Sequence, residues 1–205
     1  MKILLTGFEP FGGESINPAF EILKSLPDSI NRHKIVKFEL PCSYKKSINA
    51  IEDILAAEKP DVVLSLGQAG GSFGLCVEKV GLNLRDAESP DNDGHVASDE
   101  IIFEDGEVAY YSNLPIRKIV EKIKENNIPA SISYSAGPYV CNNVLYALLY
   151  LADKRFKGMK CGFIHVPYFP EQIMGKRNTF YMTPEEMKRG LETALMAIIE
   201  NGDMN

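Results

Sequence analysis

The sequence lacks the features that mark membrane, exported and nucleic-acid-binding proteins. None of its apolar runs approaches the roughly 18 residues that a membrane-spanning helix requires. The opening residues, MKILLTGFEPFGG, hold one lysine and a short apolar run, so we expect no signal peptide. Acidic residues outnumber basic ones, and the net charge of −6 disfavours nucleic acid as a partner. We therefore expect a cytoplasmic protein that acts on neither a membrane nor a nucleic acid.

Cysteine and histidine are also scarce, and neither follows a metal-binding spacing. The cysteines form no CxxC pair, so we interpret them as reduced thiols and not as a disulfide framework. The histidines stand far apart, which argues against a structural zinc site. We predict neither a metal nor a cofactor. The residues concerned are Cys42, Cys76, Cys141, Cys161, His33, His95 and His165.

The remaining composition is that of an ordinary globular protein. Hydrophobic residues make up 45% and charged residues 24%, and the length suits one domain over residues 1–205. Short apolar runs alternate with amphipathic segments, a pattern that predicts strands and helices in turn. Strands are expected at 2–7, 34–41, 61–67, 75–84, 129–136 and 160–167. Helices are expected at 17–26, 43–58, 114–127, 141 to about 154, and 183–200.

This alternation indicates an α/β protein. We expect a three-layer α/β/α arrangement around a mostly parallel, twisted, open sheet. Asn17 and Ser43 stand where helix N-caps are expected. Residues 85–113 form an acidic, turn-rich excursion in which we expect a small hairpin.

The stretch SAGPYVCNNVLY (135–146) places Cys141 in the first turn of a predicted helix. A helix start carries partial positive charge and unpaired N–H groups, which favour a thiolate and can hold an oxyanion. Ligands bind at the carboxyl ends of strands in open α/β sheets. We therefore expect four features to share one edge of the sheet: the loops GFEPFGG and GQAGGSFG, Cys141, and His165 at the end of the last strand.

A Cys–His pair benefits from a third group that orients the imidazole. Glu78 lies within the alternating segment LCVEKV, where an apolar residue is usual, so it is our candidate for that role. Each residue also has a purely structural interpretation. Cys141 can be a packed small side chain, His165 a hydrogen-bonded scaffold residue, and Glu78 the solvent face of an edge strand.

Two other motifs have competing interpretations. GGSFG matches the G-x-S-x-G elbow of serine hydrolases around Ser72, but that elbow requires a helix to follow. The residues after it alternate like a strand, which disfavours Ser72 as a nucleophile and also disfavours a nucleotide-binding loop. Phe8 and Phe11 can belong to the core, or they can be the walls of a flat apolar pocket.

Seen together, the motifs resemble those of pyroglutamyl peptidase type I, also called pyrrolidone-carboxylate peptidase, a family of cytosolic cysteine peptidases. The resemblance implies that Cys141 is the nucleophile, His165 the base and acid, and Glu78 the residue that orients it. It extends over almost the whole chain. The motifs that carry it are TGFEPFGG, GQAGG, VEKVGLN, SPDNDG, SNLPI, AGPYVCNNVLY and GFIHVPYFPEQ.

The resemblance also implies a substrate and an assembly. Members of this family remove N-terminal pyroglutamate from peptides, and a homotetramer is common among them. Phe8 and Phe11 correspond to aromatic residues that sandwich the lactam ring. Tyr139 and Val140 correspond to a segment that borders the ring, and Gln68 to a loop beside the site.

Three positions depart from the family pattern. Ser72 and Glu88 replace arginines, and Cys76 replaces a serine or threonine. We expect Glu88 to lie near the oxyanion, where a carboxylate opposes the chemistry. Arg85 is predicted to point to the other face of an extended segment. These departures leave two alternatives open, a same-fold cysteine hydrolase with shifted specificity and a non-catalytic binding protein.

Overall fold

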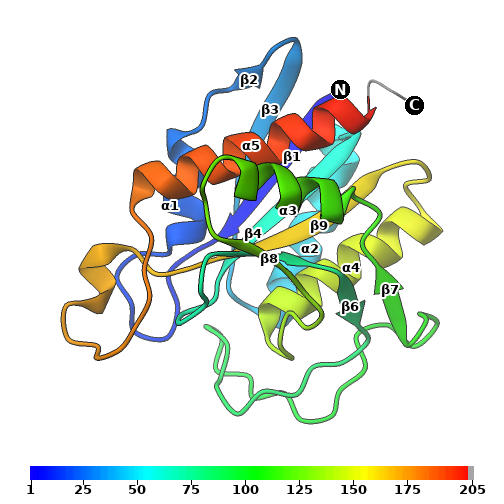
Figure 1. Cartoon of the computed structure of the whole chain (residues 1–205). Helices are drawn as coiled ribbons and strands as arrows, with labels where there is room; N and C mark the ends of the chain where they lie inside the picture. The colour runs from blue at the N-terminus through cyan, green and yellow to red at the C-terminus, as the bar shows by residue number, and fades with distance from the viewer. Residues whose placement is uncertain (203–205) are drawn as a thin grey trace.

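In the computed structural model, which describes residues 1–202, seven strands form one sheet with helices on both faces (Figure 1). Its four central strands are mutually parallel, as predicted for a three-layer α/β/α fold. In spatial order the strands are β2 (Ser29–Ile30), β3 (His33–Leu40), β1 (Lys2–Phe8), β4 (Val62–Gln68), β9 (Lys160–Val166), β5 (Leu75–Glu78) and β8 (Ala130–Ser133).

Two helix layers cover the sheet and enclose separate hydrophobic cores (Figure 1). One layer holds α1 (Pro18–Ser25), α3 (Ile116–Glu125) and α5 (Pro184–Gly202). The other holds α2 (Tyr44–Glu58) and α4 (Val140–Lys154). Strand β4 is buried along its whole length because helices cover both of its faces. No helix within the described residues is long and apolar enough to cross a membrane.

The predicted helix caps are present. The Asn17 side chain accepts a hydrogen bond of 3.1 Å from the Ala19 N–H at the start of α1. Ser43 accepts one of 3.3 Å from the Lys46 N–H at the start of α2. Each cap satisfies a backbone donor that the first helical turn leaves unpaired, so these helix starts were predictable from local sequence.

The predicted strand at 75–84 is two strands that belong to different sheets. Strand β5 joins the main sheet, whereas β6 (Val80–Leu82) pairs with β7 (Ala109–Tyr111) in a separate two-stranded sheet. The period-two pattern runs through both because alternation reports an extended backbone and not its partner. The β6–β7 pair joins the two ends of the 85–113 excursion. Within the excursion, Arg85 and Glu100 form an antiparallel bridge, and the Ala87 N–H donates to the Ala97 carbonyl oxygen at 3.0 Å, so the expected small hairpin is present as a short bridged loop.

Strands β5 and β8 run opposite to β9. The expectation that Cys141 follows a strand parallel to β9 is therefore wrong. Because β8 is antiparallel to β9, its carboxyl end points away from the edge where β9 ends. Residues 134–139 turn the chain back, with Gly137 in the left-handed region at φ 73°. Helix α4 then begins at Val140. Cys141 therefore reaches the predicted edge through a reversing loop and not by following a parallel strand.

Candidate active site

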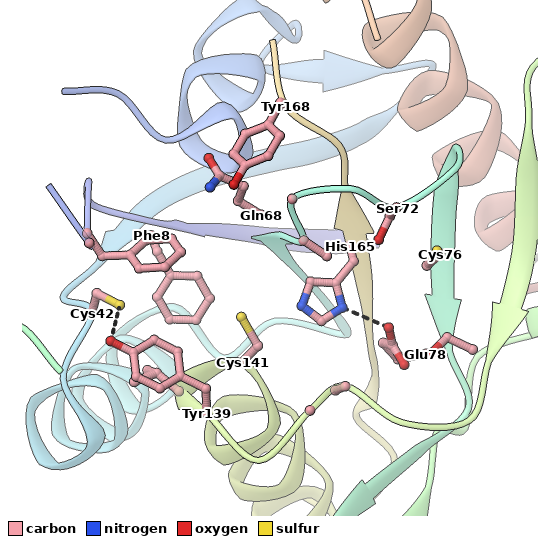
Figure 2. A pocket seen from close by; sticks show the side chains of 18 of the residues that line it. Phe8, Cys42, Gln68, Ser72, Cys76, Glu78, Tyr139, Cys141, His165 and Tyr168 are labelled. Atoms are coloured by element: carbon pink, nitrogen blue, oxygen red, sulfur yellow. Dashed lines mark hydrogen bonds and ion pairs between the residues drawn. The ribbon is translucent and has the colours of Figure 1, made fainter. Parts of the chain in front are cut away.

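A pocket of about 510 Å³ opens at the edge of the sheet where β4 and β9 end (Figure 2). It collects side chains from the loop after β1, from β5, from the loop after β8 and from the start of α4. Within residues 1–202, no group of three or more metal-ligating side chains is arranged to hold a metal ion. All the predicted site residues line this pocket: Glu78, Cys141, His165, Phe8, Phe11, Gln68, Tyr139 and Val140.

His165 and Glu78 form a buried pair inside the pocket. Nδ1 of His165 lies 2.7 Å from Oε1 of Glu78, and the two residues are 6% and 1% exposed. Because an ionised carboxylate only accepts hydrogen bonds, this contact assigns the proton to Nδ1. Nε2 is left as the basic nitrogen of the ring. Oε2 of Glu78 is buried and has no hydrogen-bond partner among the described residues.

Cys141 is the second residue of α4, and its sulfur lies against Gly67 in β4. A Cβ atom on Gly67 would stand 2.8 Å from Sγ of Cys141 and 2.7 Å from Cζ of Phe163, so only glycine fits there without a shift. Gly67 is also the register partner of His165 in the neighbouring strand. The thiol is therefore held beside the imidazole, and Figure 2 shows the two side chains facing the same space.

The electrostatics of Cys141 differ from the sequence-based expectation. Burial raises the pKa of the thiol above its ordinary value, and the neighbouring Cys42 and Glu78 act in the same direction. The helix start favours a thiolate, but its effect amounts to only about 1 kcal/mol. A thiol whose pKa is raised holds its proton more tightly, so a base beside it favours formation of the nucleophile. His165 lines the same pocket, and its Nε2 can take that role.

The start of α4 offers unpaired backbone donors beside this thiol. Tyr139 is the N-cap residue, and no side chain among the described residues caps the helix there. The first N–H groups of a helix have no acceptor within the helix, so the groups of Val140 and Cys141 are available to an oxyanion.

Aromatic rings form the opposite wall. The rings of Phe11 and Tyr139, which both line the pocket, are 6.0 Å apart. The ring of Phe163 lies in the core behind the pocket, 4.8 Å from the ring of His165. Phe8 belongs to the core at 2% exposure and also lines the pocket, so both interpretations of this residue hold. The Tyr139 hydroxyl donates to the Pro90 carbonyl oxygen at 3.0 Å, which fixes its ring.

Sequence reasoning missed several lining residues. Glu14, Cys42 and Tyr168 contribute to the pocket, and Gln172 contacts it from behind through Gln68. The strand-end rule could have found the first three, because Glu14 lies in the loop after β1, Cys42 follows β3 and Tyr168 follows β9. Gln172 ends the motif GFIHVPYFPEQ, but no chemical pattern in the sequence indicated its role.

The departures from the family pattern have different positions. Ser72 lines the pocket, but strand β5 follows it, so the strand-to-helix turn of a nucleophile elbow is absent there. Cys76 lines the pocket as the register partner of His165. Glu88 is exposed and is not among the lining residues, contrary to its expected place near the oxyanion.

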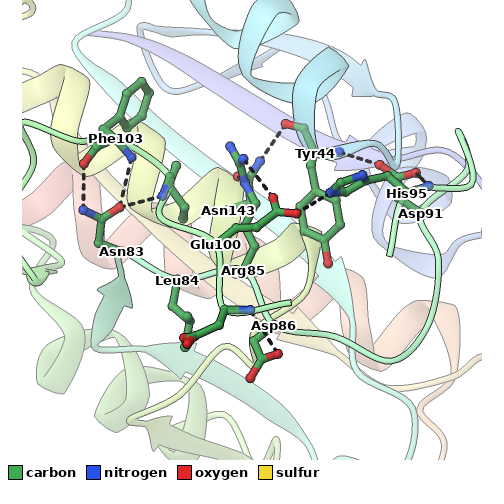
Figure 3. A network of polar contacts seen from close by, with 12 residues as sticks. Tyr44, Asn83, Leu84, Arg85, Asp86, Asp91, His95, Glu100, Phe103 and Asn143 are labelled. Atoms are coloured by element: carbon green, nitrogen blue, oxygen red, sulfur yellow. Dashed lines mark hydrogen bonds and ion pairs between the residues drawn. The ribbon is translucent and has the colours of Figure 1, made fainter. Parts of the chain in front are cut away.

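Arg85 belongs to a polar network that secures the 85–113 excursion (Figure 3). Its Nε donates to Oδ1 of Asn143 in α4 at 2.7 Å, and its guanidinium lies 3.7 Å from Glu100. The buried side chain of Asp91 accepts hydrogen bonds of 2.9 Å from the N–H groups of Tyr44, Asp93 and His95. The excursion is thereby attached to the starts of α2 and α4.

An α/β sheet whose edge pocket holds a thiol, a carboxylate-bound imidazole and an uncapped helix start has the parts of a cysteine hydrolase. A sequence profile of the family described as pyroglutamyl peptidase matches residues 1–201. The chain therefore belongs to the pyroglutamyl peptidase family, whose members are cysteine-type peptidases.

Individual relatives agree with this assignment. The chain is 53% identical over 200 residues to the pyrrolidone-carboxylate peptidase of Thermosipho africanus, covering 98% of both chains. It is 49% identical over 201 residues to that of Clostridium perfringens, covering 98% of this chain and 94% of the relative. The pyrrolidone carboxyl peptidase of Thermococcus litoralis superposes with a TM-score of 0.95 at 38% identity, covering 99% of this chain and 95% of the other.

Proposed function

We propose that this protein removes N-terminal pyroglutamate from peptides, with Cys141 as nucleophile, His165 as general base and acid, and Glu78 as the group that orients His165. The observation that carries the proposal is the position of the Cys141 sulfur over Gly67, the register partner of the Glu78-bound His165. A nucleophile beside a base that a third group orients is the arrangement needed for covalent acyl transfer.

The proposed reaction has two halves. Nε2 of His165 takes the thiol proton as Sγ of Cys141 attacks the pyroglutamyl carbonyl carbon, and backbone N–H groups at the start of α4 hold the oxyanion. His165 then protonates the leaving amine, and the shortened peptide departs. The pyroglutamyl group remains bound to Sγ of Cys141 as a thioester. Water, deprotonated by His165, cleaves the thioester to release pyroglutamate and restore the thiol.

The pocket suits an uncharged ring better than a free amino terminus. Neither lysine nor arginine occurs among the lining residues that the structure describes. Both lining carboxylates are already engaged, Glu78 by His165 and Glu14 by Lys176. A lactam carries no charge, so it needs no counter-ion, and Phe8 and Phe11 provide it with flat apolar surfaces.

The first test is release of the fluorophore from pyroglutamyl-aminomethylcoumarin by the purified protein. We expect release that iodoacetamide abolishes and that Cys141→Ala eliminates without changing the unfolding temperature. Turnover by a folded Cys141→Ala protein would overturn the assignment of the nucleophile. A folded wild-type protein that releases no fluorophore would overturn the substrate.

The compartment and assembly are part of the same proposal. All four cysteines are free thiols, which suits the reducing cytoplasm. Phe73 is 72% exposed, and its ring lies 4.5 Å from that of Phe180, so apolar surface is available for a homo-oligomer. We propose a tetramer because the family resemblance implies one. Sedimentation velocity tests the assembly, and a monomer at assay concentration would exclude it.

A further inference from the structure

The chain contains only two glutamines, and they are hydrogen-bonded to each other. Gln68 ends β4 and lines the pocket, whereas Gln172 lies outside the lining in the short helix η1 (Pro170–Ile173). Nε2 of Gln172 lies 2.9 Å from Oε1 of Gln68, and both residues are 9% exposed. A buried amide pair of this kind restricts which atom of Gln68 faces the pocket.

The orientation of the Gln172 amide is set by partners of unambiguous polarity. Its Oε1 accepts from the Phe169 N–H at 3.0 Å, and a backbone N–H can only donate. Its Nε2 also lies 3.4 Å from Oε2 of Glu14, whose carboxylate accepts. Gln172 must therefore donate to Gln68, and Gln68 must offer its oxygen in return. That leaves Nε2 of Gln68 as the polar atom available to a ligand.

Gln172 is itself held in place by an ion pair. Nζ of Lys176 lies 2.7 Å from Oε1 of Glu14 and 2.7 Å from the Gln172 carbonyl oxygen. The same ammonium group stands over the Tyr168 ring at 4.3 Å from its centroid. Gln68 lies on the side of the pocket that holds Phe8 and Tyr168, away from Glu78 (Figure 2). The donor thus faces the region of the aromatic walls and not that of the nucleophile.

We propose that Gln172 is a positioning residue for substrate recognition, which turns Gln68 so that its Nε2 donates to the lactam carbonyl oxygen. This inference rests on the proposed function. A pyroglutamyl ring differs from a prolyl ring by that carbonyl group, so a fixed donor at this point recognises the oxidised ring. A donor left without a partner in a buried pocket makes a prolyl group a poor ligand.

The informative substitution is Gln172→Glu, which reverses the polarity of the contact. The new carboxylate still accepts from Phe169, but it cannot donate to Gln68. Gln68 must then turn its N–H groups toward residue 172 and present its oxygen to the pocket, where it opposes the lactam carbonyl. The neighbouring Glu171→Gln, on an exposed side chain outside the pocket, is the matched control.

The measurements are kcat and KM on pyroglutamyl-aminomethylcoumarin, and the Kd of 2-pyrrolidinone by calorimetry. For Gln172→Glu we expect KM and Kd to rise together by roughly 10- to 100-fold while kcat changes little, since binding to the ring is lost uniformly. Glu171→Gln should match the wild type. A folded Gln172→Glu protein with unchanged KM and Kd, or with a loss confined to kcat, would overturn the proposal.

A double variant and the separate binding measurement distinguish misfolding and loss of turnover from loss of ring recognition. Gln172→Glu places two carboxylates side by side, so the exchange variant Glu14→Gln/Gln172→Glu restores the charge count if the single variant unfolds, and it should show the same rise. The calorimetric arm needs no turnover. If the wild type binds 2-pyrrolidinone and Gln172→Glu does not, but no coumarin is released, the proposed peptidase function fails while recognition of the lactam ring through Gln172 stands.

Discussion

His165 and Glu78 are joined by a 2.7 Å hydrogen bond across the two adjacent antiparallel strands β9 and β5. The contact assigns one tautomer to the imidazole, with its proton on Nδ1 and its basic lone pair on Nε2. It also buries a carboxylate at 1% exposure, with one oxygen unpartnered among the described residues. Contact with His165 lowers the cost of burying this carboxylate, which would be much larger if the imidazole were absent.

Glu78→Gln is expected to lower kcat by about 10²- to 10⁴-fold. The amide can donate to Nδ1, which moves the proton to Nε2 and leaves His165 unable to accept the thiol proton. The coumarin assay measures the loss, with Glu121→Gln on the exposed face of α3 as a control for removing a charge. A folded Glu78→Gln protein with wild-type kcat would show that Glu78 has no orienting role.

Gly67→Ala is expected to lower kcat/KM by about 10²-fold, because its Cβ would displace the Cys141 sulfur from the imidazole. The comparison variant is Gly175→Ala, where a Cβ meets nothing within 4 Å. Both proteins are assayed for turnover and for alkylation of Cys141 by iodoacetamide. Equal activity in the two variants would mean that the sulfur position is not set by Gly67.

The pH dependence of Cys141 alkylation tests the electrostatic conclusion. Burial raises the pKa of this thiol, so the reactive thiolate is a minor species near neutral pH. We expect the alkylation rate to climb about tenfold per pH unit and to keep rising beyond about pH 9. Mass spectrometry against a Cys141→Ala blank isolates the site. A rate that levels off in the acidic range would instead indicate a preformed thiolate–imidazolium pair.

Burial also links another thiol to the stability of the fold. It raises the pKa of Cys161 to about 12, whereas an unfolded thiol titrates near about 8.5. Above the pKa of the unfolded thiol, the unfolded state binds fewer protons than the native state. The contribution of this thiol to the free energy of unfolding is therefore fully present below about pH 8.5 and is lost as the pH rises toward the pKa of the folded state.

We expect this thiol to account for about 2 kcal/mol of the stability lost between about pH 8 and pH 10. Urea unfolding under reducing conditions, with Cys161→Ala for comparison, measures the difference. Equal losses in the two proteins would contradict the assignment.

Glu88→Arg is expected to leave kcat/KM within roughly threefold of the wild type, since an exposed charge outside the pocket is screened by solvent. The sequence alone predicts the opposite, a rate increase as repulsion of the oxyanion is relieved. Ser72→Arg, at a position that lines the pocket, should change KM more than Glu88→Arg does. A large gain from Glu88→Arg would place its carboxylate closer to the reaction than the structure does.

Local sequence determined much of this protein. Apolar periodicity located most of the strands and helices, Asn17 and Ser43 marked helix starts, and the motifs selected the predicted lining residues, although the strand-end rule gave the wrong path to Cys141. These features are local because a cap, an amphipathic face or a buried run depends on residues within a few positions of one another.

The tertiary structure decided what depends on distant partners. The direction of β5 and β8, the place of Gly67 under the Cys141 sulfur and the contact between Gln68 and Gln172 all join segments far apart in the chain. The pKa of Cys141 also depends on residues that are far apart in the chain. A helix start acts through one turn, whereas desolvation sums over everything packed around the thiol, and here burial is the larger effect.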